Sequence, residues 1–324
     1  MRCFMSRSFG APDVFELCEL DTPQPQQGQI RIRIAATALG FVDGLLIRGL
    51  YQIKPPLPYV PGCEIAGTVD AVGPDIAGIR VGDIAQTWQL GGGLAQFIVV
   101  DAKDVDVIAA TTPPQIAAAM LVDFQTAYYA LFEQGRTTAS DVVLVMGAGA
   151  VAQAAVQLAV LAGAEVIVAT ANAERGKAAL ALGAKAVIDY SNPNWRDALR
   201  KTTAGGTVDV VLDPVGGEIL VPAFRSLAKG GRYLVVGFAS GAISSVPVNL
   251  ALLKSASLIG VDIRHFLATQ PDRARRIRQS LLASLARGHL RAPAITTFPL
   301  DRAKDALDET MRRDKRGKVV VLPE

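Results

Sequence analysis

The stretch VVLVMGAGAVAQAAVQLA, residues 142–159, decides the fold of this chain. Its first five residues form a continuous apolar run, as in a strand buried in a parallel sheet, and the residues after Gly149 follow helical spacing. Gly147, Gly149 and Ala152 form a G-x-G-x-x-A pattern where strand meets helix. Such glycines allow a tight turn and the close approach of a diphosphate to the helix N-terminus. The stretch predicts a dinucleotide site, although the same glycines also suit a turn without a ligand.

Strands and helices alternate around this stretch. The predicted strands are Val142 to Met146, Glu165 to Ala169, Ala186 to Tyr190, Val208 to Asp213, Arg232 to Gly237 and Leu258 to Asp262. Helices follow from Ala150, from a cap at Asn172 and, later, from Pro271. This alternation predicts an α/β fold with a doubly wound parallel sheet.

The chain on either side is richer in short strands. Before about residue 120, Pro and Gly clusters separate predicted strands at Gln29 to Ala36, Ile65 to Val72 and Leu94 to Val100. Strand-like segments return at Ile295 to Phe298 and Lys318 to Leu322. We therefore predict a β-rich domain of residues 1–121 and 266–324, interrupted by a nucleotide-binding domain of residues 122–265.

Composition excludes several classes of protein. The 324 residues are 50% hydrophobic and carry a net charge of +3, which is typical of a globular protein rather than a disordered or nucleic-acid-binding one. The three cysteines and two histidines form no C-x-x-C or H-x-x-x-H pair, which argues against a multi-cysteine zinc lobe, an iron–sulfur centre or a disulfide framework. Because no signal-peptide-like run opens the chain, we expect a cytoplasmic protein without membrane attachment.

The second predicted strand of the nucleotide-binding domain indicates which dinucleotide binds. NAD sites usually place Asp or Glu at the end of this strand, whereas this chain has Thr170, followed by Arg175 and Lys177. No carboxylate repels a 2′-phosphate there, so the sequence favours NADPH. Lys177 also suits a solvated helix position without a ligand.

Nine further segments resemble one family over nearly the whole chain. They are FGAPDVFEL, VDGLLIRGLY, PGCEIAGTVDAVG, VGD, TAYYAL, LGAKAVIDY, VDVVLDPVGG, GRYLVVGFASG and RGKVVVLPE. The chain is similar to the zinc-free quinone oxidoreductase (zeta-crystallin-like) branch of the medium-chain dehydrogenase/reductase superfamily. The resemblance implies a GroES-like catalytic domain, a Rossmann domain, and a homodimer joined through the Rossmann sheets along the strand Ser257 to Ile263.

The resemblance also implies site residues. Zinc-dependent relatives bind their catalytic metal at positions that fall here on Gly40, Cys63 and approximately Val122, and two of these three cannot bind a metal. Cys63 has two possible roles, either as a small buried apolar residue or as a redox-sensitive thiol. The implied cofactor-binding residues are Thr126, Gly147, Gly149, Ala150, Val151, Asn172, Arg175, Tyr190, Val236, Gly237 and Phe238. Among these, Val236 and Phe238 also suit a buried strand end.

Two departures from the family bear on these expectations. Gly40 stands where the family usually has Asn, which removes a polar group near the nicotinamide. The loop GAGAVA is one residue shorter than the family's usual AAGGVG, and in this it is closer to NAD-using relatives.

A chain without zinc ligands favours acceptors that need no Lewis acid. Quinones and activated enones accept hydride directly from nicotinamide C4, and the developing anion needs only hydrogen-bond donors and a proton. We expect Tyr51 to be the hydrogen-bond donor, with Asp43 and Arg48 as supporting polar groups. Alternatively, Tyr51 is only a packing residue, and Asp43 and Arg48 form only a structural ion pair. The alternatives are an enoyl thioester or alkene reductase, and an NADPH-binding sensor or RNA-associated protein with little turnover.

Overall fold

The computed structural model describes residues 1–312, 315 and 317–323, so Arg316 and Glu324 at the ends of the segment RGKVVVLPE lie outside the described residues. The chain divides into two compact units. Unit 1 comprises residues 1–122 and 292–324, and unit 2 comprises residues 123–291. The first boundary lies one residue from the predicted one, whereas unit 2 extends to Arg291 rather than to residue 265.

Two helices account for the longer unit 2. Helices α9 (Ile263–Thr269) and α10 (Pro271–Ala286) pack with α3 (Asp123–Tyr128) and the π-helical turn that follows it. Phe266 stacks on Tyr129 with ring centroids 4.4 Å apart, and the Gln125 side chain donates to the Ala274 carbonyl at 2.9 Å. The apolar stripe of α10 indicates a packed helix but not the element on which it packs.

Unit 2, every residue of which is described, contains a six-stranded sheet in the order β10-β9-β8-β11-β12-β13. All neighbouring strands are parallel. The strands are β8 (Val142–Met146), β9 (Glu165–Ala169), β10 (Ala186–Ile188), β11 (Val208–Asp213), β12 (Leu227–Val235) and β13 (Ser257–Gly260). This order is that of a Rossmann fold, whose switch point here lies between β8 and β11. The predicted doubly wound sheet is confirmed.

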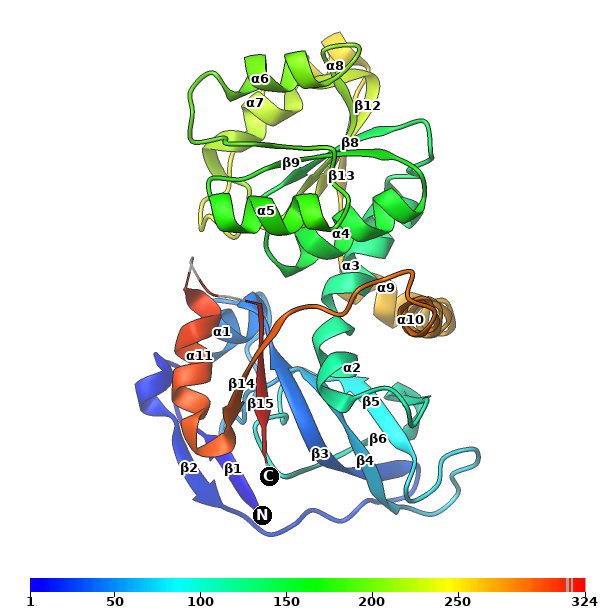
Figure 1. Ribbon diagram of the computed structural model, residues 1–324. Coiled ribbons are helices and arrows are strands. Elements are labelled where there is room, and N and C mark those ends of the chain that lie inside the picture. The colour runs from blue at the N-terminus through cyan, green and yellow to red at the C-terminus, as the bar shows by residue number, and fades with distance from the viewer. Residues whose placement is uncertain (313–314, 316, 324) are drawn as a thin grey trace. The chain divides into compact units, whose positions relative to one another are not determined.

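Helices cover both faces of this sheet. Figure 1 shows α4 (Ala150–Leu161) and α5 (Ala173–Ala181) on one face, with α6 (Trp195–Thr202) and α7 (Leu220–Phe224) on the other. A further helix, α8 (Asn249–Lys254), precedes β13. The expected last strand, Ser257 to Ile263, ends earlier because the Asp262 side chain accepts hydrogen bonds from Arg264 and His265 and caps α9 there.

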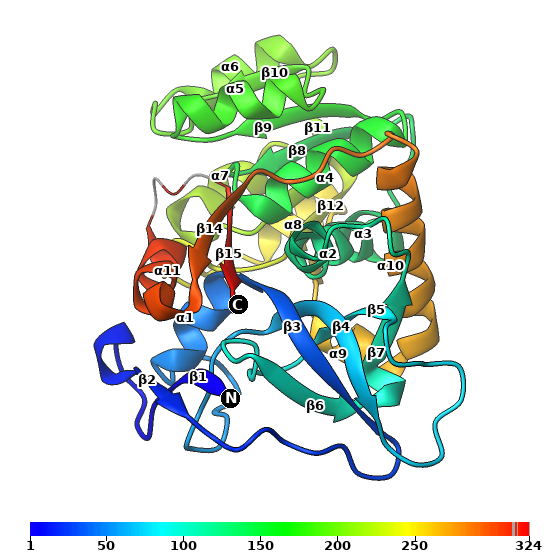
Figure 2. The same ribbon diagram turned by 60° about the horizontal axis from the view of Figure 1, so that its bottom comes forward.

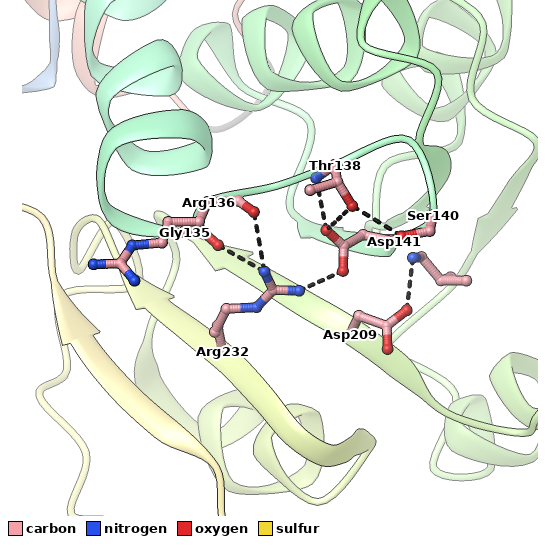
Figure 3. Close-up of polar contacts among 8 residues, drawn as sticks. Gly135, Arg136, Thr138, Ser140, Asp141, Asp209 and Arg232 are labelled. Carbon is pink, nitrogen blue, oxygen red and sulfur yellow. Dashed lines mark hydrogen bonds and ion pairs between the residues drawn. The ribbon is translucent and has the colours of Figure 1, made fainter.

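An ionic network stabilises the amino end of the sheet. Arg232, on β12, donates to the carbonyls of Gly135 at 2.9 Å and Arg136 at 3.2 Å, and forms an ion pair with Asp141 (Figure 3). Asp141 in turn accepts from the Thr138 backbone at 2.7 Å. On the neighbouring strand, the Asp209 carboxylate accepts from the backbone N–H of Val142 at 2.9 Å. These contacts tie Arg232 of β12 to the segment before β8, and the start of β8 to β11.

In the described part of unit 1 a seven-stranded sheet has the order β14-β15-β3-β4-β5-β7, with β6 also paired to β3. Pairing is antiparallel except between β14 and β15. The strands are β3 (Gln29–Leu39), β4 (Glu64–Val72), β5 (Ile84–Trp88), β6 (Phe97–Asp101), β7 (Val105–Ile108), β14 (Ile295–Pro299) and β15 (Lys318–Leu322). Figure 2 shows β15, from the end of the chain, beside β3. The predicted GroES-like β-rich architecture is confirmed.

The remaining elements of unit 1 surround this sheet. They are β1 (Arg2–Met5), β2 (Glu16–Glu19), α1 (Phe41–Ile47), α2 (Pro114–Met120) and α11 (Ala303–Met311). Strands β1 and β2 form a separate two-stranded sheet, and α11 packs against α1 and β15. Across the described residues of both units, no helix combines the length and the hydropathy that crossing a bilayer requires.

Candidate functional site

The turn between β8 and α4 lies at the carboxyl edge of the parallel sheet. Gly147 has a φ of +76°, and a Cβ added there would lie 2.8 Å from Val215 Cγ2. Its N–H donates to the Ala169 carbonyl at 2.7 Å, which ties the turn to β9. Both its conformation and its surroundings therefore require a glycine at position 147.

Gly149 has a different role from Gly147. It caps α4 in an extended conformation that any residue adopts, and a Cβ added there would meet no protein atom within 4 Å. The fold therefore does not require glycine here, whereas a diphosphate approaching the backbone does. Ala150 and Val151 follow in the partly exposed first turn, and the buried Ala152 packs close to the sheet. The geometry of this helix N-terminus fits an anionic ligand.

Asp213, the last residue of β11, joins the loops beside this turn. Its Oδ1 accepts from the backbone N–H groups of Val215 at 2.8 Å and Gly216 at 2.9 Å, and its Oδ2 accepts from the Tyr233 hydroxyl at 2.6 Å. Its carbonyl accepts from Val236 at 2.9 Å. The carboxyl group is buried, so these bonds replace all the water that a carboxylate would otherwise bind. Asp213 thus fixes the loop after β11 relative to the loop after β12.

The residues expected beside the nicotinamide all lie in unit 2. Val236, Gly237 and Phe238 follow the end of β12 and are at least partly exposed, so Val236 and Phe238 are not strand residues of the core. Thr126, on α3, is buried, and its Oγ1 has no hydrogen-bond partner among the described residues. An unpartnered buried hydroxyl costs free energy unless a ligand or water binds it. Thr126 therefore fits the role of a cofactor contact.

The expected 2′-phosphate residues lie at the start of α5. The Asn172 side chain accepts from the Arg175 N–H at 2.9 Å and caps this helix, while its own N–H donates to Thr170 Oγ1 at 3.2 Å. Arg175 and Tyr190 are both partly buried. Lys177 pairs instead with Glu174 at 2.8 Å, both being largely exposed, which agrees with a solvated helix position.

The three positions of the zinc-dependent relatives come together within unit 1. Lys318 Nζ lies 2.6 Å from Glu64 Oε1. A Cβ added at Gly40 would lie 3.5 Å from that ammonium group, and the Val122 N–H donates to Glu64 Oε2 at 3.0 Å. Cys63 immediately precedes Glu64. A buried ion pair between Lys318 and Glu64 therefore lies where these positions converge.

Asp43 and Arg48 bond to the backbone of α1. The buried Asp43 carboxylate accepts from the Gly40 N–H at 2.7 Å, and Arg48 donates to the Gly44 carbonyl at 2.9 Å. The ion pair between Asp43 and Arg48 that the sequence left open is therefore not formed, because each side chain satisfies an end of the helix. Tyr51 is partly buried against the apolar cluster beneath α1.

Burial is the largest cause of the raised pKa values of two side chains in this region. It raises the pKa of Asp43, against the opposing effects of hydrogen bonds from Gly40 and Cys63 and of the Lys318 charge. Burial and the neighbouring Asp43 also raise the pKa of the Cys63 thiol. Cys63 is 2% exposed within an apolar cluster, which favours the interpretation as a small buried residue. Among the described residues no group of three or more His, Cys, Asp or Glu side chains is placed to hold a metal ion.

Sequence reasoning missed Glu64, Lys318, Asp213 and Tyr233. Each lies in a segment that carried the family resemblance, and Asp213 directly follows the apolar run of residues 210–212. A charged residue at the end of a buried strand was the available signal, because a buried charge requires partners.

Comparison with known proteins places the chain in a family. Residues 26–110 match the alcohol dehydrogenase GroES-like domain, and residues 150–278 match the zinc-binding dehydrogenase family. The chain is 34% identical over 310 residues to quinone oxidoreductase-like protein 2 of Mus musculus, covering 92% of this chain and 86% of that protein.

Solved structures of similar proteins point to the same family. Escherichia coli quinone oxidoreductase complexed with NADPH superimposes with a TM-score of 0.92 at 25% identity, covering 100% of both chains. The CurK enoyl reductase matches with a TM-score of 0.88 at 26% identity, covering 99% of this chain and 98% of that one. The chain belongs to the medium-chain dehydrogenase/reductase superfamily, among its quinone oxidoreductase-like members.

Proposed function

We propose that this protein is a zinc-independent, NADPH-dependent oxidoreductase that reduces a quinone or an α,β-unsaturated carbonyl compound. The observation that carries the proposal is the carboxyl edge of the unit 2 sheet. There the Gly147 turn and the open N-terminus of α4 fit a dinucleotide. The unpartnered hydroxyl of the buried Thr126, on α3 of the same unit, fits a further contact. The NADPH complex of the Escherichia coli relative supports the choice of cofactor. When bound, NADPH supplies a hydride from C4 of its nicotinamide.

The chain's own residues hold the cofactor and provide hydrogen bonds. The N-terminus of α4, from Gly149 to Val151, binds the diphosphate, and Arg175 binds the 2′-phosphate with help from Asn172 and Tyr190. Thr126 and residues 236–238 line the nicotinamide end. In unit 1, the Tyr51 hydroxyl donates to the oxygen on which negative charge develops during reduction. Asp43 and Arg48 support Tyr51 indirectly, by holding the two ends of α1.

Zinc independence rests on side-chain chemistry. Gly40 has no side chain and Val122 has no lone pair to donate, so only Cys63 of the three positions offers a ligand atom. The odd number of cysteines supports the proposed cytoplasmic location.

A substrate panel tests the proposed activity. We expect the purified protein to oxidise NADPH, followed by the loss of reduced-nicotinamide absorbance, with quinones and enones but not with simple ketones. Turnover confined to 2-enoyl thioesters would instead assign the enoyl reductase activity that the likeness to CurK supports. Tight NADPH binding without turnover of any acceptor would contradict an enzymatic function.

We predict that Arg175→Ala selectively weakens NADPH binding. Loss of a charge-assisted hydrogen bond to phosphate costs about 1.5–3 kcal/mol, or roughly a 10- to 100-fold rise in Kd. The Kd of NADH, which lacks the phosphate, should change little. Lys177→Ala is the matched control, because its ammonium group pairs with Glu174. Equal weakening of NADPH and NADH, measured by fluorescence titration, would refute the assigned contact.

We also propose a homodimer formed along β13. This strand ends the sheet, pairs within unit 2 with β12 alone, and carries the half-exposed Leu258. The nearby Leu252 and Val248 of the α8 region are 80% and 85% exposed. An edge strand flanked by exposed apolar side chains suits pairing with a second copy.

The expected effect of Leu252→Asp is a shift from dimer to monomer mass in light scattering. Leu180→Asp is the control, since Leu180 is also exposed but lies on α5. If both variants and the wild-type protein have the same mass, β13 is not the interface.

A further inference from the structure

Two thiols face each other at the start of the chain. Cys3 on β1 and Cys18 on β2 are directly opposite in the antiparallel register, and their Sγ atoms are 3.4 Å apart (β1 and β2, dark blue in Figure 2). We propose that Cys3 and Cys18 form a reversible disulfide by exchange with a low-molecular-weight disulfide such as oxidised glutathione.

The backbone already has a suitable geometry for this bond. Leu20 N–H donates to the Met1 carbonyl at 2.9 Å, so residues 1 and 20 form a hydrogen-bonded pair. Such pairs recur every second residue of an antiparallel ladder, which makes Cys3 and Cys18 a pair of the same kind, with Cα atoms about 5.5 Å apart. Disulfides commonly join Cα atoms at this separation. Closing the bond therefore requires rotation of side chains rather than movement of strands.

The surroundings of the two thiols determine the order of reaction. Cys18 is partly exposed, whereas Cys3 is fully buried. Burial, the hydrogen bond with Cys18 and the charge of Cys18 raise the pKa of Cys3 to about 12. Cys18 is accordingly the thiol that reacts first with the oxidant. A sulfur in a mixed disulfide bears neither a proton nor a charge, so the contributions of Cys18 to the raised pKa of Cys3 disappear once the adduct forms.

The exchange balances in two steps. The Cys18 thiolate attacks one sulfur of oxidised glutathione, breaks its S–S bond and releases one glutathione thiolate, leaving Cys18 in a mixed disulfide. Cys3 then loses its proton and attacks the Cys18 sulfur, which releases the second glutathione. The protein gives up two electrons and two protons, and oxidised glutathione becomes two molecules of glutathione. Excess glutathione reverses both steps.

The bond would link a segment that the rest of unit 1 already holds. The Phe4 N–H donates to the Leu94 carbonyl at 2.8 Å, and Ser6 and Tyr59 exchange backbone hydrogen bonds at 3.0 and 2.8 Å. A cross-link between residues 15 apart reduces the entropy of the unfolded chain. We therefore expect oxidation to raise the melting temperature by several degrees.

The test uses the full-length protein in glutathione buffers of graded redox ratio, followed by an acid quench, thiol counting after unfolding and intact mass measurement. The reduced chain has three thiols, and oxidation should leave one, with a mass loss of two hydrogen atoms. Tryptic peptides should place the bond between Cys3 and Cys18. Reduction with excess glutathione should restore all three thiols.

Single variants distinguish the two cysteines. Cys3→Ser should stop the reaction at a glutathione adduct on Cys18, and Cys18→Ser should block it. Cys63→Ser is the matched control and should oxidise as the wild type does, because Cys63 is 2% exposed in the core. A stable glutathione adduct on the wild-type protein, or no reaction of the folded wild type while the unfolded chain reacts, would overturn the proposal.

Discussion

Lys318→Met will lower the free energy of unfolding by about 3–5 kcal/mol, because it removes the ammonium group that lies against a buried carboxylate. Lys318 Nζ lies 2.6 Å from Glu64 Oε1, and each side chain is only 4% exposed. The methionine side chain has a volume close to that of lysine, so the loss of charge rather than of packing dominates. Unfolding by urea, followed by circular dichroism, measures the change.

Two further variants separate the ion pair from general effects of substitution. Combining Lys318→Met with Glu64→Gln removes the negative charge of the buried carboxylate as well and should recover much of the lost free energy. Lys304→Met breaks a surface network with Asp13 and Asp308 in which Lys304 is 46% exposed, and should destabilise the protein far less, because exposed ion pairs contribute little to stability. If Lys318→Met were no more destabilising than Lys304→Met, the pair would have no special role in stability.

Asp213→Ala will raise the Kd of NADPH by roughly tenfold or more, a change of at least about 1.4 kcal/mol. The substitution removes the acceptor of the Val215, Gly216 and Tyr233 hydrogen bonds and leaves these donors to find other partners. We expect the loop after β11 to move in response. A Cβ at Gly147 would lie 2.8 Å from Val215 Cγ2, so that movement reaches the dinucleotide turn.

A control at the other end of the same strand tests this interpretation. Asp209→Ala also removes an acidic side chain of β11 that accepts a backbone hydrogen bond, but its partner is Val142 at the amino end of the sheet. It should lower stability and leave the Kd of NADPH unchanged. Asp213→Asn keeps an acceptor for the loop and should bind NADPH nearly as the wild type does. Equal effects of Asp209→Ala and Asp213→Ala on NADPH binding would contradict the proposed role of Asp213.

Local patterns predicted unit 2 well. The boundaries of β8, β9 and β11 are those read from the apolar runs, because strands of a covered parallel sheet are apolar on successive positions. The start of α5 was predicted from Asn172, whose side chain does cap that helix. The end of β12 was placed two residues too late, since Val236 and Gly237 are apolar or small but belong to the loop held by Asp213.

Contacts between distant segments were not predictable in the same way. The amphipathic pattern of α10 identified a packed helix but not its partner α3, which precedes all strands of the sheet in the sequence, whereas α10 follows them. Unit 2 therefore extends to Arg291, whereas the predicted domain ends at residue 265. A structural ion pair between Asp43 and Arg48 was the alternative to a role in supporting Tyr51. Both side chains instead form hydrogen bonds with backbone groups of α1 that the helix itself leaves unsatisfied.

The sequence by itself determined the strand, glycine turn and helix that fit a dinucleotide, because each requirement there is met by residues adjacent in the chain. It also determined that Gly40 and Val122 cannot bind zinc, since that follows from side-chain identity alone. Only the tertiary structure decided what surrounds those positions. Glu64 and Lys318 are 254 residues apart, and folding brings them together as a buried ion pair beside Gly40 and Val122. The pairing of two such distant charges depends on the register of β15 on β3 and of β3 on β4, which periodicity and composition do not encode.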